Sequence, residues 1–454
     1  MTTDTMTALE IGAAVQAGRA SALDITEAAL EAIRENNQAL NAFTLVADTS
    51  ARAFASEIDS RIAKGLKVGP LAGVPFAAKD LFDIQDEITM AGAKLRGSEP
   101  MATRDASSIA RMKAAGAVYL GRLNMDEFAY GFATVNAHFG TTHNPYDVDR
   151  LAGGSSGGSA AAAAAGLVPI TLGSDTNGSV RVPASLCGLF GLRPTHGSLP
   201  MDGVFPFVEQ LDTIGPFTRT VEDLATSFRV LANTSAPKQT KRSFKVARLG
   251  GWFRRNGDPD GNDGVDAIAA SFGGAPLVEL PLTEAARSAA FLITSKYGGL
   301  LHQETLRSKA MEYDPAVRDR LIAGIALSDS KVADAKLIIE QYNKDLQSAL
   351  AEFDLLLAPT TPSTAPRIAE GMIEVDGKLV SARANLGLYT QPLSVSGVPI
   401  LSVPLKRPGK LPLGIQLITN KGQEEDLFSA AELLVEAGIV GFSATATQKI
   451  EAVS

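Results

Sequence analysis

Two glycine- and serine-rich loops lie in a part of the chain that is otherwise apolar enough to form core. This stretch runs from Leu151 to Gly197; its first loop covers Gly153–Ser159 and its second covers Gly173–Ser179. An alanine run and a short apolar segment separate the loops, and each loop ends in a serine that precedes a plausible helix. Glycine-rich turns allow backbone N–H groups to converge on one centre. The stretch therefore predicts a single site with two hydroxyls and a nest for negative charge.

The length and the alternation of local patterns favour one large α/β domain with a central sheet. The chain has 454 residues, enough for two or three domains or for one oversized domain. Short apolar runs predict strands, and these alternate with helical patterns without a long structureless linker. The expected strands are 71–79, 117–121, 167–172, 245–250, 275–280, 353–358, 399–404 and 414–418. The expected helices are most of 6–66, then 107–115, 157–165, 178–188, 221–233, 264–272, most of 284–351, and 424–437.

Composition argues against several classes of protein. The net charge of −8 argues against a basic surface that holds nucleic acid. The single cysteine, Cys187, excludes an intrachain disulfide and a multi-cysteine metal site, and it fits a reducing compartment. The N-terminus has no signal-peptide pattern, and no run approaches the roughly 18 apolar residues of a membrane span. We therefore expect a cytoplasmic protein without direct nucleic-acid or membrane contacts.

The first loop contains the pattern G-x-S-x-G, which marks the nucleophile of α/β-hydrolases, at Gly153–Gly157. That nucleophile needs a strand directly before it, but the preceding residues NPYDVDRLA predict a turn-rich loop. It also needs a downstream histidine, and only His196 and His302 follow, neither at an obvious strand end. A phosphate-binding loop is excluded because Ser159-Ala160 stand where that loop needs Lys and Ser or Thr. The first loop thus has neither function.

The second loop carries a candidate nucleophile beside a candidate anion nest. Residues Asp175–Ser179 lie between an expected strand and an expected helix. Consecutive N–H groups in such a turn, next to a helix N-terminus, can stabilise the charge that grows on a carbonyl oxygen during acyl transfer. Ser179 follows directly and is the candidate nucleophile. A turn that simply reverses the chain explains this loop equally well.

A serine nucleophile needs a base, and the sequence offers no well-placed histidine. Lys79 closes an apolar run, where loss of solvent favours the neutral amine. For any single lysine, extension from a strand end toward solvent is the more common explanation. The combination of Lys79 with Ser155 and Ser179 favours the catalytic interpretation.

Four motifs make the chain similar to the amidase signature enzymes over roughly residues 10–440. They are LAGVPFAAKDLFDI around Lys79, GRLNMDEFAYG at 121–131, AGGSSGGSAAAAAAG at 152–166 and GSDTNGSVRVPASLCGLFGLRPT at 173–195. The resemblance implies a single domain over 1–454, with a large, mixed, twisted central β-sheet covered by helices on both faces. It divides the chain into an N-terminal helical segment (1–66), a catalytic core (67–230), a mostly helical specificity region (231–345) and a C-terminal part of the same sheet (346–454).

The resemblance also implies roles for individual residues. Lys79 would be the base, Ser155 a bridging serine after a cis peptide bond with Gly154, and Ser179 the nucleophile. The backbone N–H groups of the oxyanion hole would come from Thr176, Asn177, Gly178 and Ser179. Asp175 and Arg181 would shape the loop between them. No metal or other cofactor is implied, and His138 and His143 lie in a loop without a third ligand.

Segments outside the shared core suggest a small, carboxylated, urea-like substrate. They are LGGWFRRN at 249–256, AAFLITSKYGGLLHQETLR at 289–307 and LYTQPLSVSGVPI at 388–400, and they resemble the family branch of bacterial s-triazine breakdown. Arginine can bind a carboxylate through two bonds, so an arginine is the expected anchor. Arg320 resembles the position where related glutamine amidases anchor a substrate carboxylate and is the first candidate, and Arg307 is the second. Asn177 stands where the family usually has glycine; it either contacts the substrate or only fills a left-handed turn position.

Three other functions are compatible with the sequence. They are the glutamine amidase component of a tRNA-dependent amidotransferase, a general small-amide amidase, and a scaffold without activity. Against a scaffold, every triad position is filled. The resemblance further implies a small helical companion subunit wrapped along the amidase and homodimerisation, which together give a heterotetramer.

Overall fold

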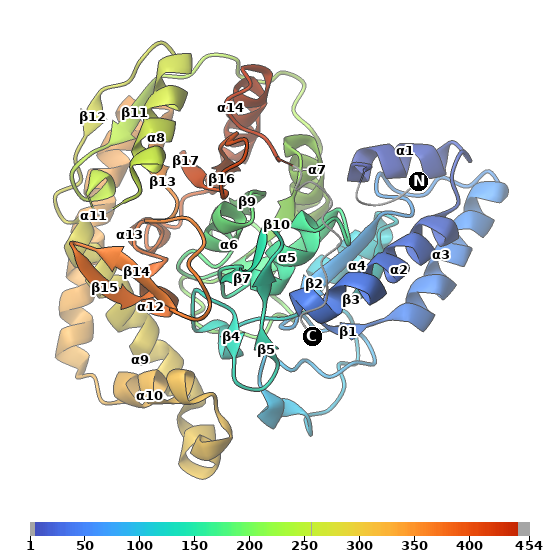
Figure 1. Ribbon diagram of the computed structural model, residues 1–454, viewed down its shortest axis with the longest axis horizontal. Coiled ribbons are helices and arrows are strands. Elements are labelled where there is room, and N and C mark those ends of the chain that lie inside the picture. The colour runs from blue at the N-terminus through green and yellow to red at the C-terminus, as the bar shows by residue number, and fades with distance from the viewer. Residues whose placement is uncertain (1–4, 256, 444–454) are drawn as a thin grey trace.

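The computed structural model describes residues 5–255 and 257–443, and its centre is a mixed β-sheet of 11 strands (Figure 1). The strands lie in the order β1-β3-β2-β8-β10-β9-β16-β17-β13-β11-β12. Their bounds are β1 Phe43–Val46, β2 Pro75–Lys79, β3 Val118–Leu123, β8 Ile170–Asp175, β9 Phe190–Arg193, β10 Thr213–Thr218, β11 Val246–Leu249, β12 Leu277–Val278, β13 Leu355–Pro359, β16 Ile400–Pro404 and β17 Gly414–Ile418. The predicted α/β architecture around a large mixed sheet is confirmed.

Helices cover this sheet, and short hairpins lie outside it. The α-helices are α1 Ala8–Gln16, α2 Ala22–Leu40, α3 Asp48–Ala63, α4 Ser107–Ala114, α5 Gly157–Ala164, α6 Arg181–Leu186, α7 Val221–Ala232, α8 Pro259–Ser271, α9 Thr283–Lys309, α10 Pro315–Ile325, α11 Asp329–Glu352, α12 Ala382–Asn385, α13 Gln391–Ser394 and α14 Glu424–Glu436. Short 3₁₀ turns are η1 Lys94–Arg96, η2 Glu127–Ala129, η3 Gly251–Arg254 and η4 Ala310–Glu312. The hairpins pair β4 Val135–Asn136 with β5 Gly140–Thr141, β6 His143–Asn144 with β7 Asp147–Leu151, and β14 Met372–Val375 with β15 Lys378–Ser381.

Both faces of the sheet are buried, as the strand β13 illustrates. Leu355 and Leu357 belong to one hydrophobic cluster, whereas Leu356 and Ala358 belong to another. Successive side chains of a strand point to opposite faces, so the two clusters lie on opposite sides of the sheet. Continuous apolar runs without alternation are typical of such doubly covered strands, which is why the sequence revealed this one.

Three strands of this central sheet were not expected from the sequence. β1 interrupts the predicted N-terminal helical segment and pairs antiparallel with β3. β9 and β10 are antiparallel partners, and β10 also pairs antiparallel with β8. The β10 sequence TIGPFT contains Gly215 and Pro216, a combination typical of a turn. In the fold this glycine allows close approach to the neighbouring strand, because an added Cβ would clash with the carbonyl oxygen of Leu192.

Several predicted boundaries shift by a few residues. The strand expected over 71–79 begins at Pro75, and the helix expected over 178–188 is the shorter α6. Thr220 caps α7 as expected, with its hydroxyl accepting from the backbone N–H of Asp223 at 3.2 Å. The helical region predicted at 284–351 forms α9, α10 and α11.

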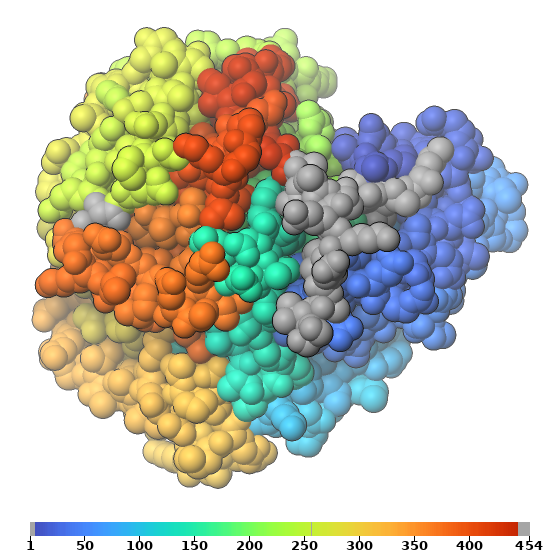
Figure 2. All heavy atoms as spheres, in the orientation of Figure 1, coloured from blue at the N-terminus to red at the C-terminus, as the bar shows by residue number. Residues whose placement is uncertain are grey.

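The helices α9 and α10 lie beside the hairpins of 135–151. Figure 2 shows these two regions side by side on one face of the molecule. The backbone N–H of Ala137 donates to Asp314, the N-cap of α10, at 3.2 Å. Residues far apart in sequence therefore meet here. In the described part of the chain, no helix combines the length and apolarity needed to cross a bilayer.

Candidate active site

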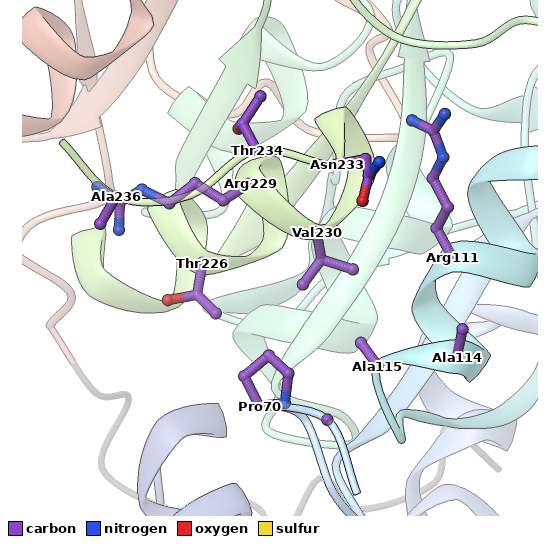
Figure 3. A pocket seen from close by; sticks show the side chains of 11 residues that line it. Pro70, Arg111, Ala114, Ala115, Thr226, Arg229, Val230, Asn233, Thr234 and Ala236 are labelled. Carbon is purple, nitrogen blue, oxygen red and sulfur yellow. The ribbon is translucent and has the colours of Figure 1, made fainter.

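A broad hollow between α4 and α7 holds none of the predicted catalytic residues (Figure 3). Its empty space, open solvent included, is about 1010 Å³. Its two arginines are already engaged: Arg229 pairs with Glu425 at 2.6 Å, and Arg111 donates to the carbonyl oxygen of Leu231. The predicted residues gather instead at the carboxyl ends of β2 and β8.

Parallel pairing of β2 with β8 places their carboxyl ends at the same edge of the sheet, with Ala78 opposite Leu172. β2 ends at Lys79, and β8 leads into the second loop at Asp175. The first loop lies at the start of α5, which packs against both strands. The sheet therefore brings together residues that are 76 positions or more apart in the sequence.

Lys79 is fully buried and its amine donates to two serines. The distance from Nζ to the Ser155 hydroxyl is 2.7 Å, and from Nζ to the Ser174 hydroxyl it is 2.9 Å. The Gly154–Ser155 peptide bond is cis, as the resemblance implied. Ser174 was not predicted from the sequence. The available signal was its place in the second loop, directly before Asp175.

Burial dominates the electrostatics of Lys79. Loss of solvent lowers the pKa of the amine to about 7, although the carboxylates of Asp126, Asp175 and Asp212 oppose that change. An amine with a pKa near 7 is largely neutral in weakly alkaline solution, and it can then accept a proton. This is the property that the sequence analysis required of the base.

Ser179 lies on a cavity whose empty space, open solvent included, is about 320 Å³. The residues around the cavity are Ala129, Tyr130, Gly131, Phe132, Thr176, Asn177, Ser179, Phe207, Phe291, Thr294, Arg320 and Gln391. Among the described residues, no hydrogen bond joins the hydroxyls of Ser155 and Ser179. The structure thus brings Lys79 and Ser155 into contact and gives Ser179 access to the cavity. The transfer between the two serines stays a prediction.

One of the four expected oxyanion donors is engaged elsewhere. The backbone N–H of Gly178 donates to a carboxylate oxygen of Asp175 at 2.7 Å. The backbone N–H groups of Thr176, Asn177 and Ser179 meet no acceptor in the described part of the chain. Gly178 is therefore removed from the expected oxyanion donors. The buried carboxylate of Asp175 is a stronger hydrogen-bond acceptor for its N–H than the carbonyl oxygen of a substrate.

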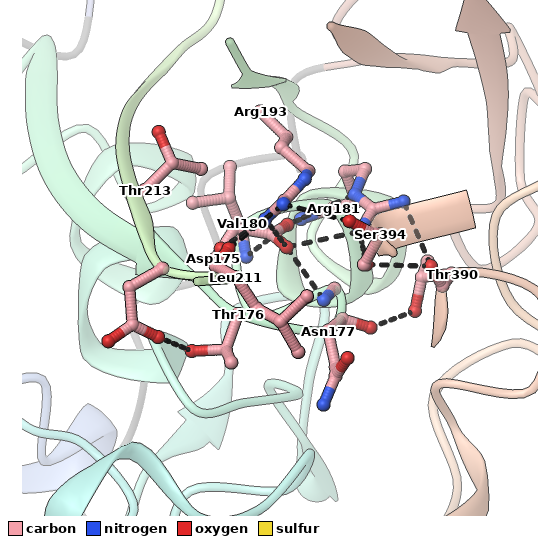
Figure 4. A network of polar contacts seen from close by, with 12 residues as sticks. Asp175, Thr176, Asn177, Val180, Arg181, Arg193, Leu211, Thr213, Thr390 and Ser394 are labelled. Atoms are coloured by element: carbon pink, nitrogen blue, oxygen red, sulfur yellow. Dashed lines mark hydrogen bonds and ion pairs between the residues drawn. The ribbon is translucent and has the colours of Figure 1, made fainter. Parts of the chain in front are cut away.

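Asp175 holds the second loop in place through two arginines (Figure 4). Its carboxylate accepts from Arg181 Nε and Nη2, both at 3.0 Å, and from Arg193 Nη1 at 3.1 Å. Burial alone would raise the pKa of Asp175, but the two guanidinium groups outweigh it and hold that pKa well below its usual range. Arg181 also donates to Gln416 and Ser394, which ties the loop to β17 and α13. Arg193 was not anticipated from the sequence.

Asn177 does not occupy a left-handed position; the positive φ of 130° belongs to Gly178. A Cβ at Gly178 would clash with the side chain of Thr390, so glycine is required there. The side-chain amide of Asn177 donates to the Thr294 hydroxyl at 2.7 Å. Its backbone carbonyl accepts from Thr390 Oγ1 at 2.7 Å. Of the two explanations weighed for Asn177, the turn-filling one is therefore wrong.

The two arginine candidates lie in different surroundings. Arg320 of α10 lies on the cavity, with its guanidinium carbon 4.1 Å from the ring centre of Tyr130 and 5.4 Å from that of Phe291. Within residues 5–255 and 257–443 it forms no ion pair with a carboxylate. Arg307 is instead exposed on α9, where it pairs with Glu304 at 2.7 Å. It is not among the residues around the cavity, so its proposed role in substrate binding is corrected.

Histidines near the site make other contacts. His138 Nε2 lies 3.1 Å from the buried carboxylate of Glu127, and His143 Nδ1 lies 2.5 Å from the carbonyl oxygen of Val148. Burial raises the pKa of Glu127 to about 8. No group of three or more His, Cys, Asp or Glu side chains is placed to hold a metal ion in the described ranges.

Comparison with known proteins agrees with this geometry. The model of the Amidase family matches residues 24–250 and 284–428. The chain is 42% identical to a 1-carboxybiuret hydrolase subunit of Pseudomonas sp. strain ADP, over 96% of this chain and 99% of that protein. It is 34% identical to a glutamyl-tRNA(Gln) amidotransferase subunit of Thermobifida fusca strain YX, over 96% of each. A solved structure from work on a vestigial protein complex and the origins of an s-triazine catabolic enzyme is similar, with a TM-score of 0.92 and 41% identity over 96% of this chain and 100% of that one.

Proposed function

This chain belongs to the amidase family, a family of amide-hydrolysing enzymes, and we propose that it is a 1-carboxybiuret hydrolase. It would release ammonia from a small, carboxylated, urea-like amide through an acyl-enzyme on Ser179. One observation carries the proposal beyond the family: Arg320 lies on the same cavity as Ser179 and has no carboxylate partner among the described residues. A partly buried cation without an ion-pair partner favours an anionic ligand.

The proposed reaction begins with the neutral amine of Lys79. It takes a proton from Ser155, which takes one from Ser179, and Ser179 Oγ attacks the amide carbon. The N–H groups of Thr176, Asn177 and Ser179 stabilise the negative oxygen that forms. The same relay then gives a proton to the leaving nitrogen, the C–N bond breaks and ammonia departs. Water attacks the acyl carbon, and Ser179 regains its proton as the acid is released.

The cavity suits an anionic substrate because Arg320 lies on its wall, beside Ser179. The guanidinium of Arg320 is fixed by the rings of Tyr130 and Phe291, so little side-chain entropy is lost when it binds a carboxylate. Burial lowers the pKa of Arg320, yet an arginine stays protonated at physiological pH.

Ammonia release from a panel of amides tests the proposed function. The panel contains carboxybiuret, biuret, allophanate, glutamine and malonamate, at equal concentrations of the purified full chain. We expect carboxybiuret to give the highest kcat/KM. A highest value for glutamine would instead identify the amidotransferase component, and equal values for charged and neutral amides would indicate a general amidase.

Replacing Arg320 with leucine should raise KM for the carboxylated substrate about 100-fold, because a buried two-point ion pair contributes about 3 kcal/mol. Hydrolysis of neutral biuret should change little. Steady-state kinetics on both substrates measure the difference. Arg307→Leu is the matched control on the neighbouring helix and should behave like the wild type. An unchanged KM in Arg320→Leu would remove the anchor role.

We also propose that the enzyme works in the cytoplasm with a small helical companion subunit, in the form of a heterotetramer. The related s-triazine enzyme was solved in work on a protein complex, which supports a heteromer. Exposed apolar side chains on α9 and α10, including Leu300, Leu301 and Ile322, provide surface for such contacts. Mass measurement of the complex purified with its neighbouring gene products tests the assembly.

A further inference from the structure

Asn177 brings a buried oxygen without a partner to the cavity wall. Only 6% of Asn177 is exposed, and its Oδ1 accepts no hydrogen bond within the described residues. The other end of the amide is fixed, because Nδ2 donates to Thr294 Oγ1 at 2.7 Å. A buried polar atom without a partner is costly, and such atoms in native proteins call for an explanation. The cavity gives one, since Asn177, Thr294 and Ser179 all lie on it.

A second side-chain amide on the same cavity has an unpaired donor instead of an unpaired acceptor. Gln391, which is 3% exposed, accepts from Arg287 Nε through its Oε1 at 3.2 Å. Its Nε2 has no acceptor among the residues described and is therefore left as a donor. Arg287 also donates to Asn385 at 2.7 Å, which holds the guanidinium in place. The cavity thus offers one fixed acceptor, from Asn177, and one fixed donor, from Gln391.

These two groups match one chemical feature of a substrate. A ureido chain alternates N–H donors with carbonyl acceptors, whereas an alkyl amide of the same length has methylene groups where the ureido chain has N–H. We propose that Asn177 Oδ1 accepts a hydrogen bond from a ureido N–H of the substrate, and that Gln391 donates to a neighbouring carbonyl. Together they make the enzyme prefer ureido amides to alkyl amides. This inference rests on the proposed function, since it concerns the same site.

Discrimination of this kind is stronger than discrimination by size. A site with a buried acceptor rejects a ligand that lacks the matching N–H, because the acceptor then stays unpaired and out of water. Thr294 is the positioning residue, because its hydroxyl directs the amide of Asn177 and leaves Oδ1 for the ligand. The glycine usual in related enzymes at position 177 would provide no such acceptor.

Two stable ligands that differ in one group test the inference. N-carbamoylglycine and succinamate have the same length and the same carboxylate, but an N–H in the first is a methylene in the second. Equilibrium binding is measured by calorimetry on the full-length Ser179→Ala chain, which cannot turn the ligands over. We expect N-carbamoylglycine to bind about tenfold more tightly. Adding Asn177→Gly should reduce this ratio to about one.

A matched control comes from another asparagine. Asn343 in α11 also has an Oδ1 without a partner in the described ranges, and its Nδ2 donates to Val395 O at 3.2 Å, but it does not lie on the cavity. Asn343→Ala should leave the tenfold ratio intact. Thr294→Val is the second variant if Asn177→Gly fails to fold. It should weaken the ratio because the amide is no longer held.

The outcomes separate this inference from the proposed function. Equal binding of the two ligands by the unaltered site, or a ratio that survives Asn177→Gly, would overturn the role of Asn177. If the role of Asn177 were overturned but the wild type still released ammonia from carboxybiuret, the proposed function would hold without the inference about Asn177. A tenfold ratio in a chain that does not hydrolyse carboxybiuret would support ureido recognition and reject that particular substrate.

Discussion

Replacing Ser179 with alanine is expected to lower kcat for ammonia release by at least about 10⁴-fold. The hydroxyl forms the bond to the acyl carbon, and no other group on the cavity can replace it. The residual rate would come from the oxyanion donors and from binding alone. Release of ammonia from the best substrate of the panel measures kcat. Mass spectrometry after mixing with an amide-mimicking acylating probe shows whether an acyl-enzyme forms.

The control for this variant is a serine outside the site. Ser198 is exposed, and its hydroxyl donates to the carbonyl oxygen of Thr195 at 2.7 Å. Ser198→Ala should retain full activity and should still acquire the acyl mass. If Ser179→Ala retained its activity or its acyl adduct, the nucleophile would have to be another residue.

Replacing Lys79 with methionine is expected to lower kcat by about 10³-fold or more near neutral pH, because the relay then has no proton acceptor. Lys79→Arg should be equally inactive, since a guanidinium does not release its proton at this pH. Lys79→Met should still fold, because methionine fills the buried site without charge. Far-ultraviolet circular dichroism verifies the fold. Full activity in either variant would remove Lys79 as the base.

The same residue predicts the pH dependence of the wild type. The active form has a neutral Lys79 amine, whose pKa is about 7. Below this pH the amine is protonated, so kcat/KM should fall about tenfold per pH unit, and above it kcat/KM should reach a plateau. Stability should change in the same direction. Between pH 7 and the unfolded value of 10.5 only the unfolded chain holds this proton, so unfolding free energy rises with pH across that window. A profile that is flat from pH 5 to 9 would contradict the assignment.

The candidate groups of the site could be predicted from local sequence. The two glycine- and serine-rich loops, the apolar run that ends at Lys79 and the missing histidine base make Lys79 and Ser179 candidates, and the resemblance to the amidase signature enzymes implies a triad of these two residues with Ser155. These features are short and contiguous, because a tight turn needs its glycines at fixed positions and a buried strand needs an unbroken apolar run. The long helices α9 and α11 were equally accessible, since helical periodicity is strong over many residues.

Sheet pairing settled what local sequence left open. Strand β10 contains Gly215 and Pro216, a pair that resembles a turn, and only its partners β8 and β9 make it a strand. The register of β2 beside β8 gives Lys79 its second partner, Ser174. Neither fact follows from any single segment, because pairing depends on residues distant in the chain.

The sequence by itself determined the family of the chain, and it predicted the residues proposed for the reaction and a nest for negative charge at the second loop. Only the tertiary structure decided which of several similar groups lie on the cavity. It separated Arg320 from Arg307 and showed that Asp175 occupies the N–H of Gly178. It also left one oxygen of Asn177 without a partner. The physical reason is that the burial and the hydrogen bonds of a side chain depend on neighbours from remote segments. A sequence motif contains no information about those neighbours.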